Sequence, residues 1–155
     1  MSAVPPPRRV GNADIIHHEG YDETINSPFV PAIRTVSNAR LVFISGVMGA
    51  PVYHDHPHDP AVFDAMPMDA EGQARNAFHH LDLALRAAGC ERHDVVNMIR
   101  FFSHVEEDQD VVNAIQKEYF GGHIPTSTTV QVVRFATDPR LRLEFHVVAA
   151  AAPGD

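Results

Sequence analysis

The stretch that decides the fold is the last predicted strand, residues 141–148, which reads Leu141-Arg142-Leu143-Glu144-Phe145-His146-Val147-Val148. Apolar residues alternate with ionisable ones, which is the pattern of a strand with one face on a hydrophobic core. The second face carries a base, an acid and an imidazole, namely Arg142, Glu144 and His146. Three ionisable groups on one strand face indicate either a solvated sheet surface or the floor of a site.

Composition narrows the class of protein. The chain has 155 residues, 45% hydrophobic and 21% charged, which is typical of one globular domain. Its net charge of −8 disfavours nucleic acid as a partner, because phosphate binding needs a basic surface. The single cysteine, Cys90, excludes an intrachain disulfide and any multi-cysteine metal site. The sequence shows no signal peptide and no apolar run of roughly 18 residues, so we expect a cytoplasmic protein without a membrane partner.

The N-terminal part of the chain predicts a tail and a hairpin. Residues 1–14 begin with a Pro-rich segment and read as a flexible tail or an arm on the surface, followed by a single domain over residues 15–150. Residues 32–36 and 40–46 read as strands joined by a turn at residues 37–39, which suggests an N-terminal hairpin. Residues 47–68 contain four prolines, and an irregular connection of this length is usually functional or mobile.

Two helices follow from apolar spacing and from their end signals. Asp69 can cap a helix whose apolar positions recur at three and four residues until Gly89. Residues 94–102 read as a strand, and a second helix runs from about Glu106 to Gly121. Strands at 128–135 and 141–148 complete the order ββ–α–β–α–ββ. This order predicts an α+β two-layer sandwich, with a mixed sheet and two helices on one face.

The predicted sheet is too apolar for a monomer. Residues 94–102 are largely apolar on both faces, whereas two helices can cover only one face. The other face must therefore be buried by another copy of the chain. We expect a homo-oligomer with a site where subunits meet.

A histidine-rich loop, His54-Asp55-His56-Pro57-His58-Asp59, lies within the irregular connection. Alternation in an extended segment places its three imidazoles on one side, an arrangement that suits zinc or copper. The sequence departs from the HxHxDH arrangement of binuclear metallohydrolases, and a mobile polar loop is the simpler reading. We favour a loop that reshapes a cleft and supplies a histidine to a substrate, and we predict no metal. Cys90, just past a helix end, is expected to be inert because a helix C-terminus raises a thiol pKa.

Over about residues 29–149 the chain resembles the RidA (reactive intermediate deaminase, YjgF) family. The motifs that carry the resemblance are individually weak, but their order and spacing together are specific. The segments that carry it are 43–46, 87–89, 94–96, 110–113, 118–120, 125–130 and 143–144. The resemblance implies a chorismate-mutase-like α+β fold and a homotrimer with clefts between subunits. It also implies hydrolysis of reactive enamines and imines, such as 2-aminoacrylate, to ketones and ammonia without a cofactor.

The resemblance also assigns residues, with one large departure. Glu144 matches the acid that positions the hydrolytic water, Asn113 matches the family asparagine, and the backbone of Ser45-Gly46 matches the lining of the cleft. Phe29 falls near the place of a family tyrosine, and His146 lies beside Glu144 as a further substrate contact. The family motif Pro-Ala-Arg-Ser is Pro-Thr-Ser-Thr at residues 125–128, so Ser127 replaces the arginine that clamps a substrate carboxylate.

Three functions remain open at this point. The first is an imine or enamine deaminase whose small-molecule substrate is larger than 2-aminoacrylate, such as a 2-aminomuconate-type or a biosynthetic intermediate. The second is a trimer that binds a metabolite without turnover, which the loss of the arginine favours. The third and weakest is a ribonuclease, because the net charge is −8. Glu144 could also be a surface residue paired with Arg142 or His146, and Asn113 a helix-surface amide.

Overall fold

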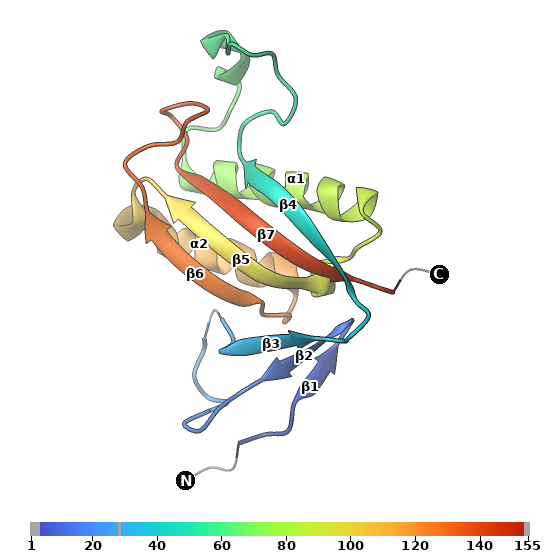
Figure 1. The fold of residues 1–155 in the computed structure, drawn as a ribbon. Helices are drawn as coiled ribbons and strands as arrows, with labels where there is room; N and C mark the ends of the chain where they lie inside the picture. Colours follow the sequence, from blue (N-terminus) through green and yellow to red (C-terminus); the bar gives the residue numbers. More distant parts are fainter. Residues whose placement is uncertain (1–3, 28, 154–155) are drawn as a thin grey trace.

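The computed structural model describes residues 4–27 and 29–153. The elements are β1 Arg8–Val10, β2 Ala13–Ile16, β3 Ala32–Thr35, β4 Arg40–Met48, η1 Pro60–Phe63, α1 Ala70–Ala87, η2 Arg92–Asp94, β5 Val95–Phe102, α2 Val105–Phe120, β6 Thr126–Gln131 and β7 Leu143–Ala151. Strands β1 to β4 come first, and the two long helices follow, separated by β5, before the last two strands (Figure 1).

The larger sheet has four strands in the order β4-β7-β5-β6. β7 pairs antiparallel with β4 and β5, and β5 pairs parallel with β6, so the sheet is mixed. Both helices pack on the same face, behind the sheet in Figure 1. The α+β two-layer sandwich predicted from the sequence is therefore confirmed.

Both helices begin and end where their sequence signals predict. The Asp69 carboxylate accepts a hydrogen bond of 2.8 Å from the Gly72 amide and caps α1. Gly89, just beyond α1, and Gly121, at the end of α2, have φ of 69° and 56°, a backbone conformation that favours glycine. These ends place the apolar stripes of both helices over the core.

The predicted N-terminal hairpin is wrong. β3 pairs with β2 in a separate three-stranded sheet, β1-β2-β3, whereas β4 leaves it and pairs with β7. The local turn at residues 37–39 is present, but Val42 and Ile44 of β4 pair with Ala149 and Val147 of β7 and pack into the main core. A long-range partner thus replaces the neighbouring strand.

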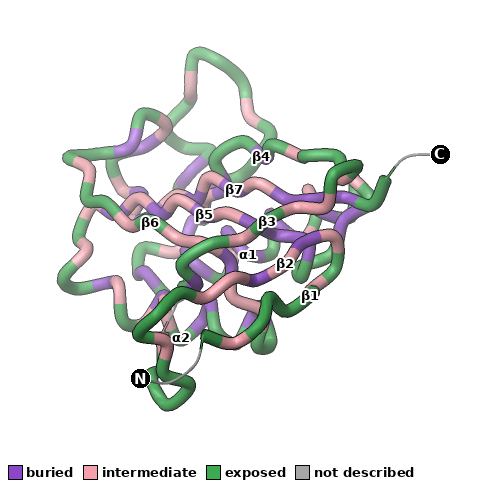
Figure 2. The backbone as a smooth tube through the Cα atoms, turned by 60° about the horizontal axis from the view of Figure 1, so that its bottom comes forward, coloured by how far each residue is buried: buried purple, intermediate pink, exposed green. Residues whose placement is uncertain are grey.

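The predicted flexible tail over residues 1–14 is wrong for its second half, because β1 begins at Arg8 and β2 at Ala13. Residues 1–3 lie outside the described residues. The three-stranded sheet lies across one end of the open face of the larger sheet (Figure 2). There Ala13 packs against Val96 and Ala150, and the side chain of Asn12 donates to the Ala150 carbonyl. This contact explains why residues 8–14 are ordered rather than tail-like.

The last two strands are shifted from their predicted bounds. β6 begins at Thr126 and ends at Gln131, and β7 begins at Leu143 rather than at residue 141. The alternation that predicted β7 is nevertheless confirmed: Leu143, Phe145 and Val147 are fully buried against the helices, and Glu144 and His146 lie on the opposite face. Within the described residues, neither helix is long and apolar enough to cross a membrane.

Candidate functional site

The open face of the larger sheet brings Glu144 and Gly46 into direct contact. A β-bulge interrupts the pairing of β4 with β7 between Ile44 and Val47, next to the place where Met48 pairs with Glu144. A Cβ built on Gly46 would overlap the carboxylate of Glu144. The absence of a side chain at residue 46 therefore lets this carboxylate lie on the strand backbone.

Partial burial sets the electrostatics of Glu144. Desolvation raises the pKa of its carboxyl group above the ordinary value of 4.5, and the nearby His146 opposes this rise. His146 lies two residues further along the same face of β7 and pairs with Ile99 of β5. A half-buried carboxylate with a raised pKa beside an imidazole is suited to orienting water or exchanging a proton.

A groove of about 650 Å³ runs along β4. Its lining includes Ser45 and Gly46 of β4 and residues of α1, among them His80 and Ala84. Glu144 does not line the groove but lies against Gly46 beside it. The histidine-rich loop contributes the remaining wall through His54 and His56. The loop therefore borders the groove that contains the Ser45-Gly46 backbone.

The histidine-rich loop is anchored rather than mobile. Phe63, which follows it in η1, is buried to 1% exposure in a small apolar cluster. Arg140 donates to the carboxylate of Asp64 at 2.7 Å and to the carbonyl of Pro60 at 3.0 Å. The prolines prevent a helix, but these contacts fix the course of the chain.

Arg142 is not part of the polar group on β7. Its guanidinium donates to both carboxylate oxygens of Asp108, at 2.8 and 2.9 Å, and to Glu107 at 3.0 Å. These acids lie in the first turn of α2, and Asp108 is buried. The arginine joins the strand to the helix layer, which leaves Glu144 without the cation that the alternating pattern placed beside it.

Asn113 lies on the other side of the sheet from Glu144. It is on α2, and its amide oxygen accepts a hydrogen bond of 2.6 Å from Nη1 of Arg100. Arg100 of β5 pairs with Phe145, whose side chain is in the helix-side core. Within one chain, the sheet therefore separates the two residues that the resemblance assigns to catalysis.

Arg100 is a feature of this region that sequence reasoning missed. Its side chain is 4% exposed, and burial lowers the pKa of its guanidinium. Its partners are all neutral: Asn113, Gln116 at 3.0 Å and Thr129 at 2.7–3.0 Å. The sequence did hold one sign of this network, because Arg100 is a charged residue at an otherwise apolar position of the strand Val95–Phe102.

A second cavity, of about 450 Å³, lies beside Asn113. It is lined on one side by α2 and on the other by the segment that connects β2 to β3, including Asn26 and Ser27. Lys117 of α2 donates to the side chain of Asn26 at 2.9 Å and holds that segment in place. Phe29, farther along this connection, is half exposed and is not among the residues that line the cavity.

Ser127 also belongs to the helix side. In the β5–β6 ladder it pairs with Met98, which is fully buried under the helices. Its hydroxyl oxygen is buried and has no hydrogen-bond partner within residues 4–27 and 29–153. The predicted site residues thus form two groups: Ser45, Gly46, Glu144 and His146 on the open face, and Asn113 and Ser127 on the α2 side. Among the described residues, Phe29 joins neither group through a contact.

Comparison with known proteins decides the family. A family model described as "Endoribonuclease L-PSP" matches residues 23–151. The chain belongs to this family. The match covers β3 to β7 and all of the residues assigned above to either group, and it confirms the predicted resemblance to RidA and YjgF proteins.

Curated relatives within this family are named as deaminases. The chain is 29% identical over 114 residues to the 2-iminobutanoate/2-iminopropanoate deaminase of Mus musculus, which covers 74% of this chain and 78% of the relative. It is 28% identical over 124 residues to the putative reactive intermediate deaminase TdcF of Escherichia coli K12, which covers 78% and 88% of the two chains.

Solved structures show the same fold. The Rid-family protein YyfB of Yersinia pestis superposes with a TM-score of 0.69 at 20% identity, covering 90% of this chain and 98% of that one. The protein YJGH superposes with a TM-score of 0.61 at 25% identity, covering 96% and 98%. The first likeness establishes the architecture alone.

Proposed function

We propose that the chain is a cofactor-independent deaminase that hydrolyses an enamine or imine at the open face of its larger sheet. The observation that carries the proposal is the half-buried carboxylate of Glu144 lying on the backbone of Gly46. The names of the curated relatives support reactive-imine chemistry for this family.

The proposed reaction needs one water molecule and one group that moves protons. An enamine first takes up a proton at carbon to become the protonated imine. Glu144 then accepts a proton from water as the water oxygen bonds to the carbon of the C=NH2+ group, which gives a neutral carbinolamine. The carboxyl group gives that proton to the amino nitrogen and takes up the hydroxyl proton as the C–N bond breaks, so a ketone and ammonia leave. Ammonia finally takes the proton from the carboxyl group and leaves the carboxylate as it began. A raised pKa suits this exchange, because the carboxylate then holds a proton more readily between the two steps.

A homotrimer with clefts between subunits would complete this site. The uncovered part of the open face carries apolar side chains, among them Phe43 at 71% exposure, Leu41 at 50% and Val130 at 40%. Packing of a second copy here would exclude bulk water from around the carboxylate of Glu144. It would also allow Asn113 of one copy to approach Glu144 of another, which the sheet prevents within one chain.

The substrate would differ from the small 2-imino acids named for the mouse relative. Ser127 cannot replace the carboxylate-clamping arginine, because its hydroxyl is a neutral group whose oxygen is buried from solvent. Arg100 does not replace it either, since Asn113, Gln116 and Thr129 already accept from its guanidinium. The groove of about 650 Å³ beside Ser45 and Gly46 favours a larger substrate, such as a 2-aminomuconate-type or a biosynthetic intermediate.

Ammonia release from freshly generated imines tests this function. Two imines are generated in the assay in the presence of the wild-type chain or of Glu144→Gln. One is 2-iminopropanoate, and the other is a larger imine with an uncharged side chain. We expect faster ammonia release for the larger imine and loss of the acceleration in Glu144→Gln. The exposed Glu23→Gln serves as the matched control. Equal rates for wild type and Glu144→Gln would remove Glu144 from the mechanism.

A metabolite-binding trimer without turnover is the second candidate. The absence of the family arginine at residue 127 favours it. Saturable binding of a stable ketone or enamide analogue by calorimetry, together with no ammonia release, would support this candidate over the deaminase. Ribonuclease activity, which the description of the family suggests, is disfavoured by the net charge of −8.

A further inference from the structure

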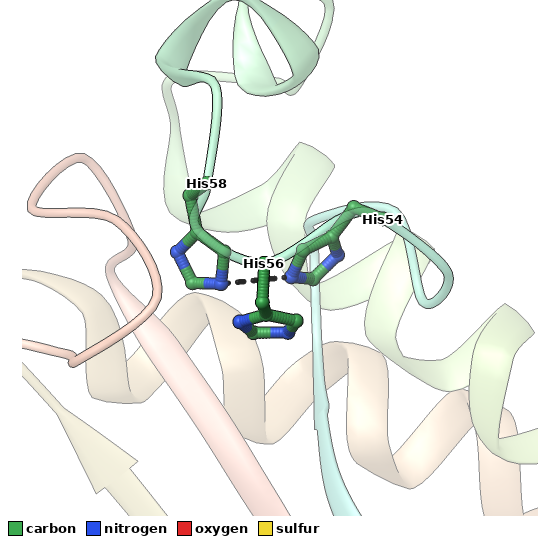
Figure 3. A group of neighbouring side chains, drawn as sticks. All are labelled: His54, His56 and His58. Atoms are coloured by element: carbon green, nitrogen blue, oxygen red, sulfur yellow. Dashed lines mark hydrogen bonds between the residues drawn. The ribbon is translucent and has the colours of Figure 1, made fainter.

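The side chains of His54, His56 and His58 converge (Figure 3), and the first two also line the groove along β4. One nitrogen from each of the three imidazoles lies within 4.8 Å of the others. Within the described part of the chain, no fourth histidine, cysteine or carboxylate joins this group. The three rings come from one short segment, so the arrangement depends on the local course of the loop.

The backbone around the loop fixes which nitrogen of two of these rings carries a proton. Nδ1 of His54 lies 2.9 Å from the carbonyl oxygen of Pro51, and Nδ1 of His58 lies 3.2 Å from that of Thr137. A carbonyl oxygen only accepts hydrogen bonds, so both Nδ1 atoms must be the donors. In the neutral rings both Nε2 atoms therefore carry no proton and each presents a lone pair.

These two bare nitrogens face each other. Nε2 of His54 and Nε2 of His58 are 3.2 Å apart. Two lone pairs at this distance repel each other unless a positive charge lies between them, and a metal ion or a proton could supply it. The question is then which cation the geometry fits.

The separation matches the bite of a tetrahedral metal ion. With Zn–N bonds of about 2.0–2.1 Å, two nitrogens at a tetrahedral angle lie about 3.3 Å apart. The Nδ1–H groups of His54 and His58 donate to backbone carbonyls, which is the outer-shell arrangement that usually orients metal-ligating imidazoles. The exposed side chain of His56 is close enough to complete a three-nitrogen set by a rotation.

The two inner rings are held rigidly. The ring of Phe63, 1% exposed, packs edge-on against those of His54 and His58, with centroids 5.1 and 5.6 Å away. The cluster is thus preorganised on a buried aromatic ring, and binding a metal there would require little ordering of the chain.

We propose that His54, His56 and His58 form a binding site for a divalent transition-metal ion, with Zn²⁺ as the best fit, at the wall of the groove along β4. Three imidazoles suit zinc, nickel or cobalt better than calcium or magnesium, which prefer oxygen ligands. Three protein ligands leave a fourth position for water or for a molecule in the groove, as in sites that act on ligands rather than in closed structural sites. This site is independent of the proposed deaminase activity.

The test uses the full chain without a histidine tag, stripped of metal with a chelator. Titration with Zn²⁺ in a calorimeter is expected to show one ion per chain. Co²⁺ is expected to give the intense visible bands of a four-coordinate site. His54→Ala and His58→Ala should each weaken Zn²⁺ binding by more than the roughly 10–100-fold typical of losing an outer-shell partner. The same measurement on Mg²⁺ should show no binding.

The matched control is His18→Ala, an exposed histidine two residues beyond the end of β2 and outside the histidine-rich loop. It should bind Zn²⁺ as the wild type does, and circular dichroism checks that every variant is folded. A more conservative variant, His58→Gln, keeps a polar side chain of similar size and should still lose the ion. Absence of Zn²⁺ binding, or binding that survives His54→Ala and His58→Ala, would overturn the proposal and leave a proton as the cation between the rings.

Discussion

The carboxylate of Glu144 occupies the place where the Cβ of any side chain at Gly46 would lie. Gly46 sits at a β-bulge, so its backbone is also free from the regular ladder to β7. The two residues come from strands about 100 positions apart in sequence, and their contact defines the floor of the candidate site.

We expect Gly46→Ala to impair activity by displacing Glu144. The added methyl group overlaps the carboxylate, which must rotate away from the strand backbone. Ammonia release should fall towards the level of Glu144→Gln. The double variant should be no slower than either single variant, because both changes remove one interaction. Additive losses would show that the two residues act separately.

Glu144→Gln should stabilise the protein at neutral pH while it abolishes turnover. Burial raises the pKa of Glu144 in the folded state, so the folded chain holds the proton more tightly than the unfolded chain. The stability that this group contributes is present below the ordinary carboxyl pKa of 4.5 and is lost as pH rises through the raised value. The melting temperature of the variant should therefore exceed that of wild type at pH 7, and the difference should shrink towards pH 4. A lower melting temperature at pH 7 would contradict this account.

Arg100→Ala should be strongly destabilising. It removes a buried side chain and leaves the amide oxygens of Asn113 and Gln116 without their donor. Leaving a buried acceptor without its donor costs about 1–3 kcal/mol, to be measured by urea denaturation. Arg75→Ala is the control, because Arg75 is half exposed and pairs with Glu71 on the surface of α1. Similar losses for the two variants would mean that the Arg100 network contributes little.

The oligomer is expected to depend on the open face. Phe43→Glu places a charge at a side chain that is 71% exposed in the single chain. Light scattering after size exclusion should show a trimer for wild type and a monomer for this variant. Leu83→Glu changes a 46% exposed residue on the outer side of α1 and should leave the trimer intact. A monomeric wild type would remove the inter-subunit cleft from the proposed function.

The helices and the last strand were predictable because their signals are local. The cap at Asp69 and the glycine at Gly121 each set one helix end through contacts within a turn or two. The alternation around Phe145 sets the two faces of a single strand. The structure has each of these features where the sequence predicts it. The pairing of β4 with β7 was not predictable from the turn at residues 37–39, because it joins segments about 100 residues apart.

The site was only partly predictable for a related reason. Alternation placed Glu144 and His146 on one face, but it could not show that Arg142 bends away to Asp108. Helical spacing could not show that Asn113 binds Arg100 across the core. Tertiary packing decides on which face of the sheet a distant helix lies. A single sequence does not show which strand side chains will meet that helix.

The bulge at Gly46 has a consequence for solubility. β4 is an edge strand of the larger sheet, and a long regular edge can recruit a strand from another molecule and start open-ended aggregation. The bulge between Ile44 and Val47 breaks the regular row of donors and acceptors on this strand, and Pro51 follows soon after its end. The feature that makes room for a carboxylate therefore also discourages fibre-like growth along the sheet, while its open face stays free for a closed assembly.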